Sequence, residues 1–240
     1  MVDPRVNVIE QRLKRITRII AVSSGKGGVG KSMVATTLAL SLVKLGYKAG
    51  LFDLDFTSPS THIILGVEGL QPKEEKGLVP PVVHGLEYMS LVYYSGNKAT
   101  PLRGTDTSNA LIELLAVTLW SDLDYLVIDM PPGIGDAVLD LLRLVPRVEF
   151  LIVTTSSLLA FETVKKLSSL LRELNVSILG VVENMKMNDS SDVKWRTEML
   201  GLKFLMGIPY DPKIEASIGN AEKLLETSFA QRVNSIAQRV

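Results

Sequence analysis

Eight residues near the N-terminus have the types and spacing of a phosphate-binding loop. They are Gly25, Lys26, Gly27, Gly28, Val29, Gly30, Lys31 and Ser32, and they fit the pattern G-x-x-x-x-G-K-[ST]. Glycines allow the backbone to curl with its N–H groups inward, and a following helix presents its positive end to the phosphates. We therefore expect Lys31 to reach the β- and γ-phosphates and the Ser32 hydroxyl to bind Mg²⁺. The alternative is a glycine-rich turn without a ligand.

Lys26 adds a second cation to a loop that needs only the lysine at its end. The loop does not easily fold both lysine side chains onto one γ-phosphate. We expect Lys26 to act on a nucleotide in a facing subunit, in the manner of an arginine finger supplied in trans. The alternative is a solvated surface lysine.

Three aspartates follow apolar runs and supply the carboxylates that phosphoryl transfer requires. Asp53 and Asp55 follow the run at 49–52, and their spacing puts both side chains on one face if the extended conformation continues. Asp129 follows the run at 123–128, which is the Walker B arrangement that holds Mg²⁺ directly or through water. We expect Ser32, Asp53 and Asp129 at the metal. For each aspartate the alternative is a cap of the next helix or turn.

Other catalytic and metal-binding arrangements are not supported. His62 and His84 have no partner at metal-ligand spacing, and neither a Ser-His-Asp set nor a dinucleotide fingerprint can be built. The chain contains no cysteine, which excludes disulfides, cysteine nucleophiles and thiolate-held zinc or iron–sulfur clusters within it. We expect no iron–sulfur cluster in the isolated chain.

Short β-branched apolar runs alternate with helical patterns along the chain, as in a parallel sheet buried on both faces. Strands are predicted at 16–22, 49–52, 123–128, 148–154, 176–182 and 204–208, and helices at 31–45, 108–119, 137–144, 161–174 and 228–240. The alternation predicts a doubly wound, mostly parallel α/β sheet with helices on both faces and ligands at the carboxyl ends of the strands.

Two segments depart from this alternation. The prolines and glycines at 77–94 predict an extra strand or hairpin at the sheet edge, and the polar run at 186–194 predicts a mobile loop. No repeat or low-complexity linker divides the chain. We expect one domain over residues 1–240, with 1–14 as an N-terminal extension.

The composition is that of a globular protein, with 46% apolar and 22% charged residues. Basic and acidic residues number 26 each, so no overall field draws the protein to nucleic acid, and we expect no nucleic-acid partner. The N-terminus lacks a secretory apolar region, and no apolar run approaches the roughly 20 residues that span a bilayer. These features predict a soluble cytoplasmic protein.

The chain resembles the Mrp-type branch of the deviant Walker A P-loop ATPases in five segments, which occur in the same order and spacing. These segments are SSGKGGVGKS, DLDFTSPS, DYLVIDMPPGIGD, VVENM and IPYDP. This branch contains iron–sulfur cluster carriers and is related to the MinD and ParA ATPases. The resemblance covers about residues 15–240, and PPGIGD with ENM is more specific to the branch than the loop is.

The resemblance implies a homodimer that binds and slowly hydrolyses ATP with Mg²⁺ and serves a client protein. By position, Lys26 resembles the signature lysine that contacts ATP across the dimer, and Asp55 resembles the carboxylate that orients the attacking water. Asp129 falls in the second switch segment. Asn184 resembles the residue that hydrogen-bonds adenine, and Pro209 belongs to a segment that packs against the base.

One departure bears on the family role. In the iron–sulfur carriers a C-x-x-C pair follows ENM, whereas residues 186–194 here contain no thiolate. The resemblance therefore supports the ATPase more strongly than cluster carriage. Two alternatives are a MinD- or ParA-like positioning ATPase and an adaptor that binds ATP without hydrolysing it. The positioning role would use a membrane-binding C-terminal helix, and the apolar stripe at Phe229, Val233, Ile236, Ala237 and Val240 is more typical of buried core.

Overall fold

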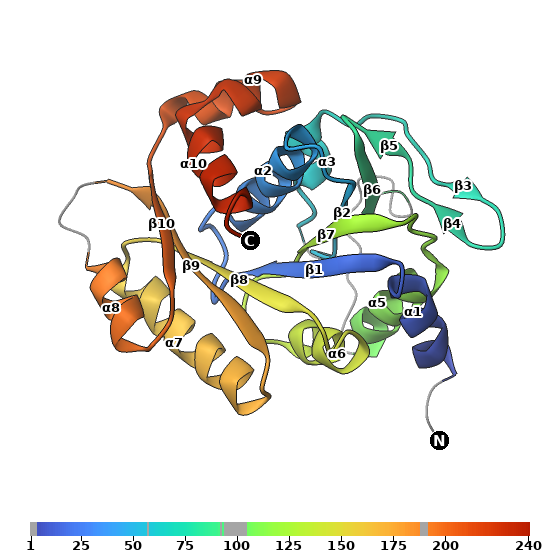
Figure 1. The fold of residues 1–240 in the computed structure, drawn as a ribbon, viewed down its shortest axis with the longest axis horizontal. Coiled ribbons are helices and arrows are strands. Elements are labelled where there is room, and N and C mark those ends of the chain that lie inside the picture. Colours follow the sequence, from blue (N-terminus) through green and yellow to red (C-terminus); the bar gives the residue numbers. More distant parts are fainter. Residues whose placement is uncertain (1–3, 57, 92, 94–104, 188–191) are drawn as a thin grey trace.

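A sheet of eight strands runs through the centre of the computed structural model (Figure 1), which describes residues 4–56, 58–91, 93, 105–187 and 192–240. The strand order is β10-β9-β8-β1-β7-β2-β6-β5, and every pair is parallel except β5 with β6. The strands are β1 (Ile16–Ser23), β2 (Ala49–Asp53), β5 (Val82–Val83), β6 (Leu86–Ser90), β7 (Leu123–Asp129), β8 (Glu149–Thr154), β9 (Ser177–Lys186) and β10 (Phe204–Pro209). This topology confirms the doubly wound, mostly parallel sheet.

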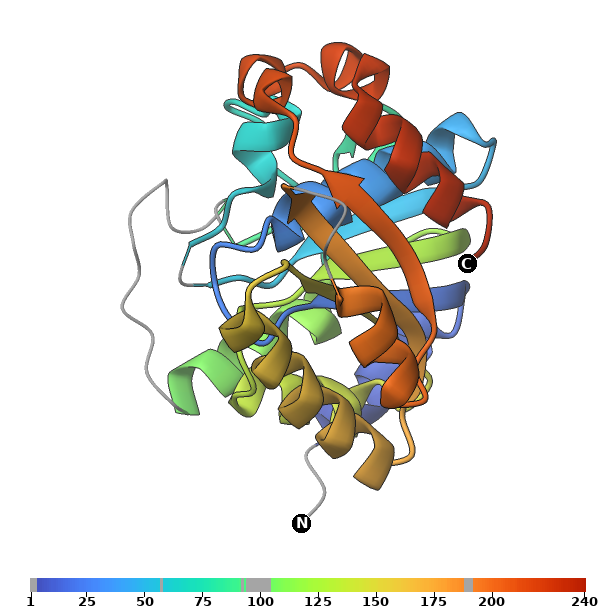
Figure 2. The same cartoon turned by 90° about the vertical axis from the view of Figure 1, so that its left-hand side faces the viewer.

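Helices cover both faces of the sheet (Figures 1 and 2). One face carries α2 (Lys31–Lys44), α3 (Thr61–Leu65), α9 (Ala221–Glu226) and α10 (Ser228–Ala237). The other carries α1 (Arg5–Leu13), α5 (Thr105–Val117), α6 (Asp136–Leu144), α7 (Leu158–Glu173) and α8 (Val193–Met199). A 3-10 helix, η1 (Pro212–Ser217), follows β10.

The alternation of side chains along β1 explains why each face has its own core. Ile19 and Ala21 pack into the cluster beneath α5, α6 and α7, whereas Ile20 and Val22 pack into the cluster beneath α2 and α10. Both faces of the strand are therefore buried, which matches its nearly continuous apolar sequence.

The edge of the sheet beyond β2 confirms the predicted hairpin. Val82 pairs with Glu87 across the antiparallel β5–β6 turn, and β6 also extends the parallel sheet beside β2. A separate two-stranded ribbon of β3 (Lys73–Glu74) and β4 (Leu78–Val79) precedes it. Residues 92 and 94 of the predicted segment lie outside the described residues.

Several element boundaries differ from those predicted. The helix α7 begins at Leu158 because Ser157 caps it, accepting a hydrogen bond from Ala160 N. The strand β9 continues to Lys186, beyond the predicted end at residue 182. Of the predicted loop at 186–194, the last residues belong to α8, and residues 188–191 lie outside the described part of the chain.

The ends of the chain also pack on the core. On α1, Ile9 and Leu13 are buried in the cluster that includes α5. The α10 helix ends at Ala237, and its stripe of Phe229, Val233 and Ile236 is buried in the cluster shared with α2. That stripe is core, as its spacing favoured. Within the described residues, no helix combines the length and apolar character needed to cross a membrane.

Candidate nucleotide-binding site

The candidate loop lies where the strand order of the sheet reverses. Strand β1 sits between β7 and β8, and the chain leaves its carboxyl end through residues 25–30 to begin α2 at Lys31. In open α/β sheets this crevice at the carboxyl ends is where ligands bind.

Two glycines of the loop occupy positions that a larger residue cannot take. Gly30 has a φ of 79° and caps α2, and a Cβ there would collide with the amide of Asn184. A Cβ on Gly25 would collide with the Thr163 hydroxyl and lie 2.8 Å from the Thr163 backbone carbon. The loop is therefore packed against the end of β9 on one side and against α7 on the other.

Lys31 joins the carboxylates that the sequence predicted beside the loop. Its Nζ lies 2.5 Å from Asp129 Oδ1, 3.9 Å from Asp55 Oδ2 and 3.2 Å from Ser32 Oγ. The side chains of Lys31, Asp55 and Asp129 are 6%, 7% and 0% exposed. Buried charges require partners of opposite charge, and Lys31 is the cation that pairs with both carboxylates. Asp129 Oδ2 accepts no hydrogen bond from any residue that the structure describes.

Asp53 lies beside Asp129 in the sheet but forms hydrogen bonds with different residues. The two residues are in register between β2 and β7. Asp53 Oδ1 accepts a hydrogen bond from Asp55 N at 3.0 Å, and its Oδ2 accepts from Thr61 Oγ1 at 2.6 Å. The Thr61 hydroxyl is 2.8 Å from the hydroxyl of Tyr88. Burial, followed by the nearby Asp129 charge, raises the pKa of Asp53 to about 7.

The strand β2 ends at Asp53, so the extended conformation does not continue to Asp55. Asp55 turns toward Lys31 and accepts a hydrogen bond from Ser58 N at 3.1 Å. Asp55 lines the pocket over the loop, whereas Asp53 is not among its lining residues. Direct coordination of Mg²⁺ by Asp53 stays a prediction.

A pocket of about 560 Å³ opens over the loop. It is lined by Ser24, Lys26, Gly27, Gly28, Gly30, Lys31, Ser32, Met33, Asp55, Ser58, Ser60, Ile63, Ile64, Pro132 and Ile218. Lys26 is exposed, and its ammonium group forms no ion pair within the described part of the chain. The backbone at Lys26 is held by Ser24, whose Oγ donates to the Lys26 carbonyl at 2.9 Å.

A second pocket, of about 200 Å³, adjoins the first and shares Gly30 and Met33 with it. Its other lining residues are Asn184, Met185, Pro209, Tyr210, Asp211, Pro212, Ile214, Glu215 and Phe229. The Asn184 amide is buried and donates from Nδ2 to Val29 O at 3.0 Å. The structure thus brings together the two segments that the sequence suggested for a base, beside the loop suggested for phosphates.

Thr61 and Tyr88 are site residues that the sequence analysis missed. Thr61 begins α3, and Tyr88 lies in β6, where it is fully buried. For Thr61, the only available sequence signal was its place as a threonine shortly after the strand that ends at Asp53. The histidines take structural positions, since His62 is buried in α3 and His84 Nε2 lies 2.9 Å from Leu65 O.

Comparison with known proteins relates the chain to one family. The ParA family model described as "NUBPL iron-transfer P-loop NTPase" matches residues 15–240. A Pseudomonas fragi protein named "Iron-sulfur cluster carrier protein" is 43% identical over 79% of the chain and 67% of its own length. A protein of the same name from Escherichia coli K12 is 39% identical over 90% of the chain, which spans 55% of that relative.

Solved structures with the same fold include nucleotide-bound proteins. A nucleotide-binding protein from Archaeoglobus fulgidus, in complex with ADP, has a TM-score of 0.79 and 28% identity, covering 94% of this chain and 95% of that one. The cell division ATPase MinD of Pyrococcus furiosus has a TM-score of 0.70 at 23% identity, covering 93% and 98%. At that identity, the likeness to MinD shows the fold alone.

Proposed function

The chain belongs to the ParA family of NUBPL iron-transfer P-loop NTPases, and from this premise we propose that it is a slow, Mg²⁺-dependent ATPase that works in the cytoplasm as a homodimer. The nucleotide bound to the chain, ATP or ADP, would control its affinity for a client protein in iron–sulfur cluster assembly. The observation that carries the proposal is the buried Lys31, which lines the loop pocket and pairs with Asp129 and Asp55.

The two adjoining pockets match the two ends of ATP. The phosphates would lie in the larger pocket, against the backbone of residues 25–30 and the start of α2. Entry of the phosphates would give Lys31 a stronger anionic partner than the carboxylate it contacts here. The adenine would lie between Asn184 and the Pro209–Tyr210 segment. An asparagine amide can donate to and accept from an adenine edge at the same time.

Ser32 and Asp129 fit a magnesium ion. Both offer the hard oxygen ligands that Mg²⁺ prefers, and Asp129 Oδ2 is a buried acceptor without a hydrogen bond from the described residues. Bound Mg²⁺ would neutralise charge on the β- and γ-phosphates. Asp129 would hold the ion directly or through water, and release of Lys31 from Asp129 would free the carboxylate for that task.

Asp55 and Lys26 supply the remaining roles in hydrolysis. Asp55 lines the phosphate pocket, and its backbone is fixed by Asp53, so its carboxylate can orient an attacking water. Lys26 is exposed at the rim, from which it can reach the phosphates held by a second copy of the chain. A cation supplied in this way stabilises charge that develops in the transition state.

The chain's own residues do not fit an iron–sulfur cluster, since it has no cysteine. Aspartate and histidine are poor substitutes for thiolate ligands of such a cluster. Cluster transfer by this protein would therefore require ligands from the client, and the chain's contribution would be the ATP-driven switch.

A lysine-to-alanine pair on α2 tests the proposal. Lys31→Ala removes the cation from the phosphate pocket, and we expect ATP binding to become undetectable by titration calorimetry. Lys44→Ala, at the exposed end of the same helix, is the control and should bind ATP as the parent does. Unchanged ATP affinity in Lys31→Ala would refute the phosphate-loop assignment.

A further inference from the structure

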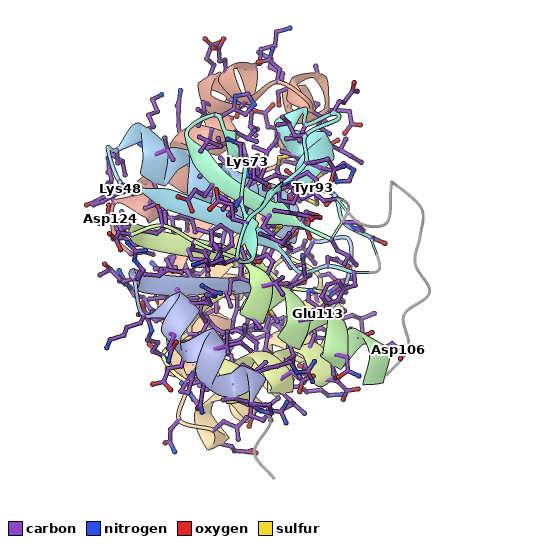
Figure 3. The ribbon with its side chains drawn as sticks, turned by 90° about the vertical axis from the view of Figure 1, so that its right-hand side faces the viewer. Lys48, Lys73, Tyr93, Asp106, Glu113 and Asp124 are labelled. Carbon is purple, nitrogen blue, oxygen red and sulfur yellow. The ribbon has the colours of Figure 1, made fainter. Side chains whose placement is uncertain are left out.

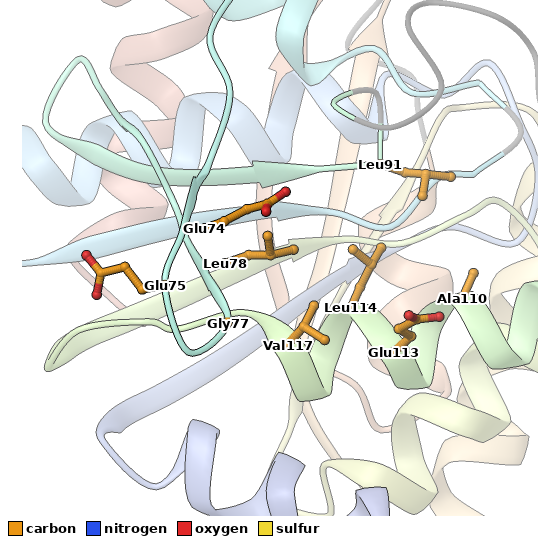
Figure 4. A pocket seen from close by; sticks show the side chains of 9 residues that line it. All are labelled: Glu74, Glu75, Gly77, Leu78, Leu91, Ala110, Glu113, Leu114 and Val117. Atoms are coloured by element: carbon orange, nitrogen blue, oxygen red, sulfur yellow. The ribbon is translucent and has the colours of Figure 1, made fainter.

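A groove with an apolar floor lies between the β3–β4 ribbon and α5, two elements that are neighbours in Figure 3. Its volume is about 440 Å³, within the range of about 300–1,000 Å³ typical of ligand sites. It is lined by Glu74, Glu75, Gly77, Leu78, Leu91, Ala110, Glu113, Leu114 and Val117 (Figure 4). None of these residues lines the phosphate or base pocket.

The groove is built on fixed backbone. Leu119 N donates to Leu78 O at 2.8 Å, and Leu78 forms a parallel bridge with Thr118, so the β3–β4 ribbon is tied to the chain just after α5. Leu78 and Leu91 are half-buried and pack against the core cluster that contains Leu114. The floor is therefore a preformed surface.

Carboxylates stand on both sides of this floor. Figure 4 shows Glu74 extending from the ribbon and Glu113 from α5, with Leu78, Leu114 and Val117 between them. Glu74, Glu75 and Glu113 are exposed, and none of them forms a salt bridge with a cation among the described residues.

The arrangement of these carboxylates indicates which kind of ligand the groove can bind. Among the residues described, no group of three acidic or histidine side chains is close enough to hold a metal ion. A nucleic acid would be repelled, since its backbone is anionic. Separated carboxylates flanking apolar side chains instead complement a chain that carries cations on either side of an apolar anchor.

We propose that this groove binds a peptide segment of a partner protein in which an apolar side chain lies between Lys or Arg residues. The apolar side chain inserts between Leu78, Leu114 and Val117. The flanking cations pair with Glu74 and Glu113, where opposite charge gives specificity and faster encounter. The site uses no residue of the nucleotide machinery and stands or falls separately from the ATPase proposal.

Selection of peptides tests this inference directly. A displayed library of random 12-residue peptides would be panned against the full chain, and enriched peptides would be synthesised with a fluorophore for anisotropy titration. We expect enriched sequences with Lys or Arg on both sides of Leu, Ile, Phe or Met. Raising the salt concentration should weaken their binding, since the rim charges are exposed to solvent.

Three variants locate the binding. The double substitution Glu74→Lys and Glu113→Lys should weaken binding by about tenfold or more, since it replaces two attractions with repulsions. Ala110→Phe fills the groove without changing charge and should weaken binding similarly. Glu173→Lys, an exposed carboxylate in the last turn of α7, is the matched control and should leave binding unchanged. Thermal unfolding of each variant checks that it is folded.

Other results would overturn the proposal. These are a library without enriched binders, binders that lack basic residues, or binders unaffected by both the charge reversal and Ala110→Phe. A second copy of the chain is the competing occupant. If Ala110→Phe abolishes a concentration-dependent dimer in light scattering and no peptide competes with that dimer, the groove is a self-association surface instead.

Discussion

The side chain of Asn184 donates a hydrogen bond from Nδ2 to the carbonyl oxygen of Val29, at 3.0 Å. This contact joins the end of β9 to the middle of the phosphate loop, across 155 positions of sequence. Both groups are buried, so neither can exchange its partner for water without moving. Asn184 therefore has a second task besides the base contact proposed for it, since it fixes the loop that precedes α2.

Asn184→Ala should reduce both ATP affinity and the preference for ATP over GTP. The buried Val29 carbonyl loses its donor, which costs about 1–3 kcal/mol in unfolding free energy, and the edge of the adenine loses its partner. Titration calorimetry with both nucleotides, together with chemical denaturation, measures these effects. Asn109→Ala, an exposed amide on α5, is the control. Equal affinity for ATP and GTP in the parent and in Asn184→Ala would show that the base assignment is wrong.

The sequence predicted the site best where parallel strands end together. Asp129 and the loop before Lys31 follow neighbouring strands, and the carboxyl ends of such strands meet at one edge of a sheet. The spacing of Asp53 and Asp55 could not reveal that β2 ends at Asp53, because that end depends on a hydrogen bond from Asp55 N back to the Asp53 carboxylate. The spacing of apolar residues predicts which faces of a strand are buried, but it does not predict a local hydrogen bond between a side chain and the backbone that ends the strand.

Contacts between segments that are distant in the sequence could not be predicted from sequence patterns. Thr61 bonds to Asp53, and Tyr88 bonds to Thr61, only because α3 begins near the end of β2 and β6 lies beside β2. The groove with the apolar floor likewise combines the β3–β4 ribbon with α5. Neither grouping leaves a periodic trace in one stretch of chain, so each required the tertiary structure.

Thr61→Val should slow ATP hydrolysis while leaving ATP binding largely intact. Valine keeps the shape but removes the hydroxyl that donates to Asp53 Oδ2 and contacts Tyr88. Removal of the donor from a buried acceptor costs about 1–3 kcal/mol, so the unfolding free energy should fall by that order. Asp53 would then hold the backbone of Asp55 less firmly. The measurements are steady-state phosphate release, ATP titration and denaturant unfolding.

Thr37→Val is the matched control for Thr61→Val. Thr37 is equally buried, and its hydroxyl has no hydrogen-bond partner among the described residues. Its replacement should leave both stability and hydrolysis close to those of the parent. If Thr61→Val hydrolyses ATP at the parental rate, the chain of hydroxyls from Tyr88 to Asp53 does not position Asp55.

Anaerobic reconstitution with iron and sulfide should leave the isolated chain without a stoichiometric cluster, since thiolate ligands are missing from its sequence. Iron and sulfide analysis after desalting, with visible absorbance, measures the outcome. The Pseudomonas fragi relative named as an iron–sulfur cluster carrier, treated in parallel, is the positive control. A stable chromophore with matching iron content in this chain would contradict the prediction.

Lys26→Ala and Asp55→Ala should fail at different steps of the ATP cycle, although both side chains line the same pocket. Lys26→Ala retains Lys31 and the backbone cradle, so it should bind ATP, but no cation would cross to the partner's phosphates. ATP-dependent dimerisation should be lost, and hydrolysis should fall with it, because a cation in trans contributes about 10³–10⁵ in rate. Asp55→Ala should bind ATP and dimerise but hydrolyse slowly, because only the orientation of water is lost.

Light scattering behind a sizing column, with and without ATP, separates the two variants. Asp55→Ala should persist as a dimer after ATP addition, whereas Lys26→Ala should remain a monomer at every ATP concentration. Lys223→Ala, an exposed lysine on α9, controls for the loss of a surface charge and should behave as the parent. Removal of Asp55 also takes away the second of the two carboxylates paired with Lys31 and leaves Asp129, so a loss of ATP binding in Asp55→Ala would indicate that Asp55 orients Lys31 and not water. If Lys26→Ala dimerises with ATP as the parent does, the cross-subunit role is wrong, and Lys26 is an ordinary lysine of the loop.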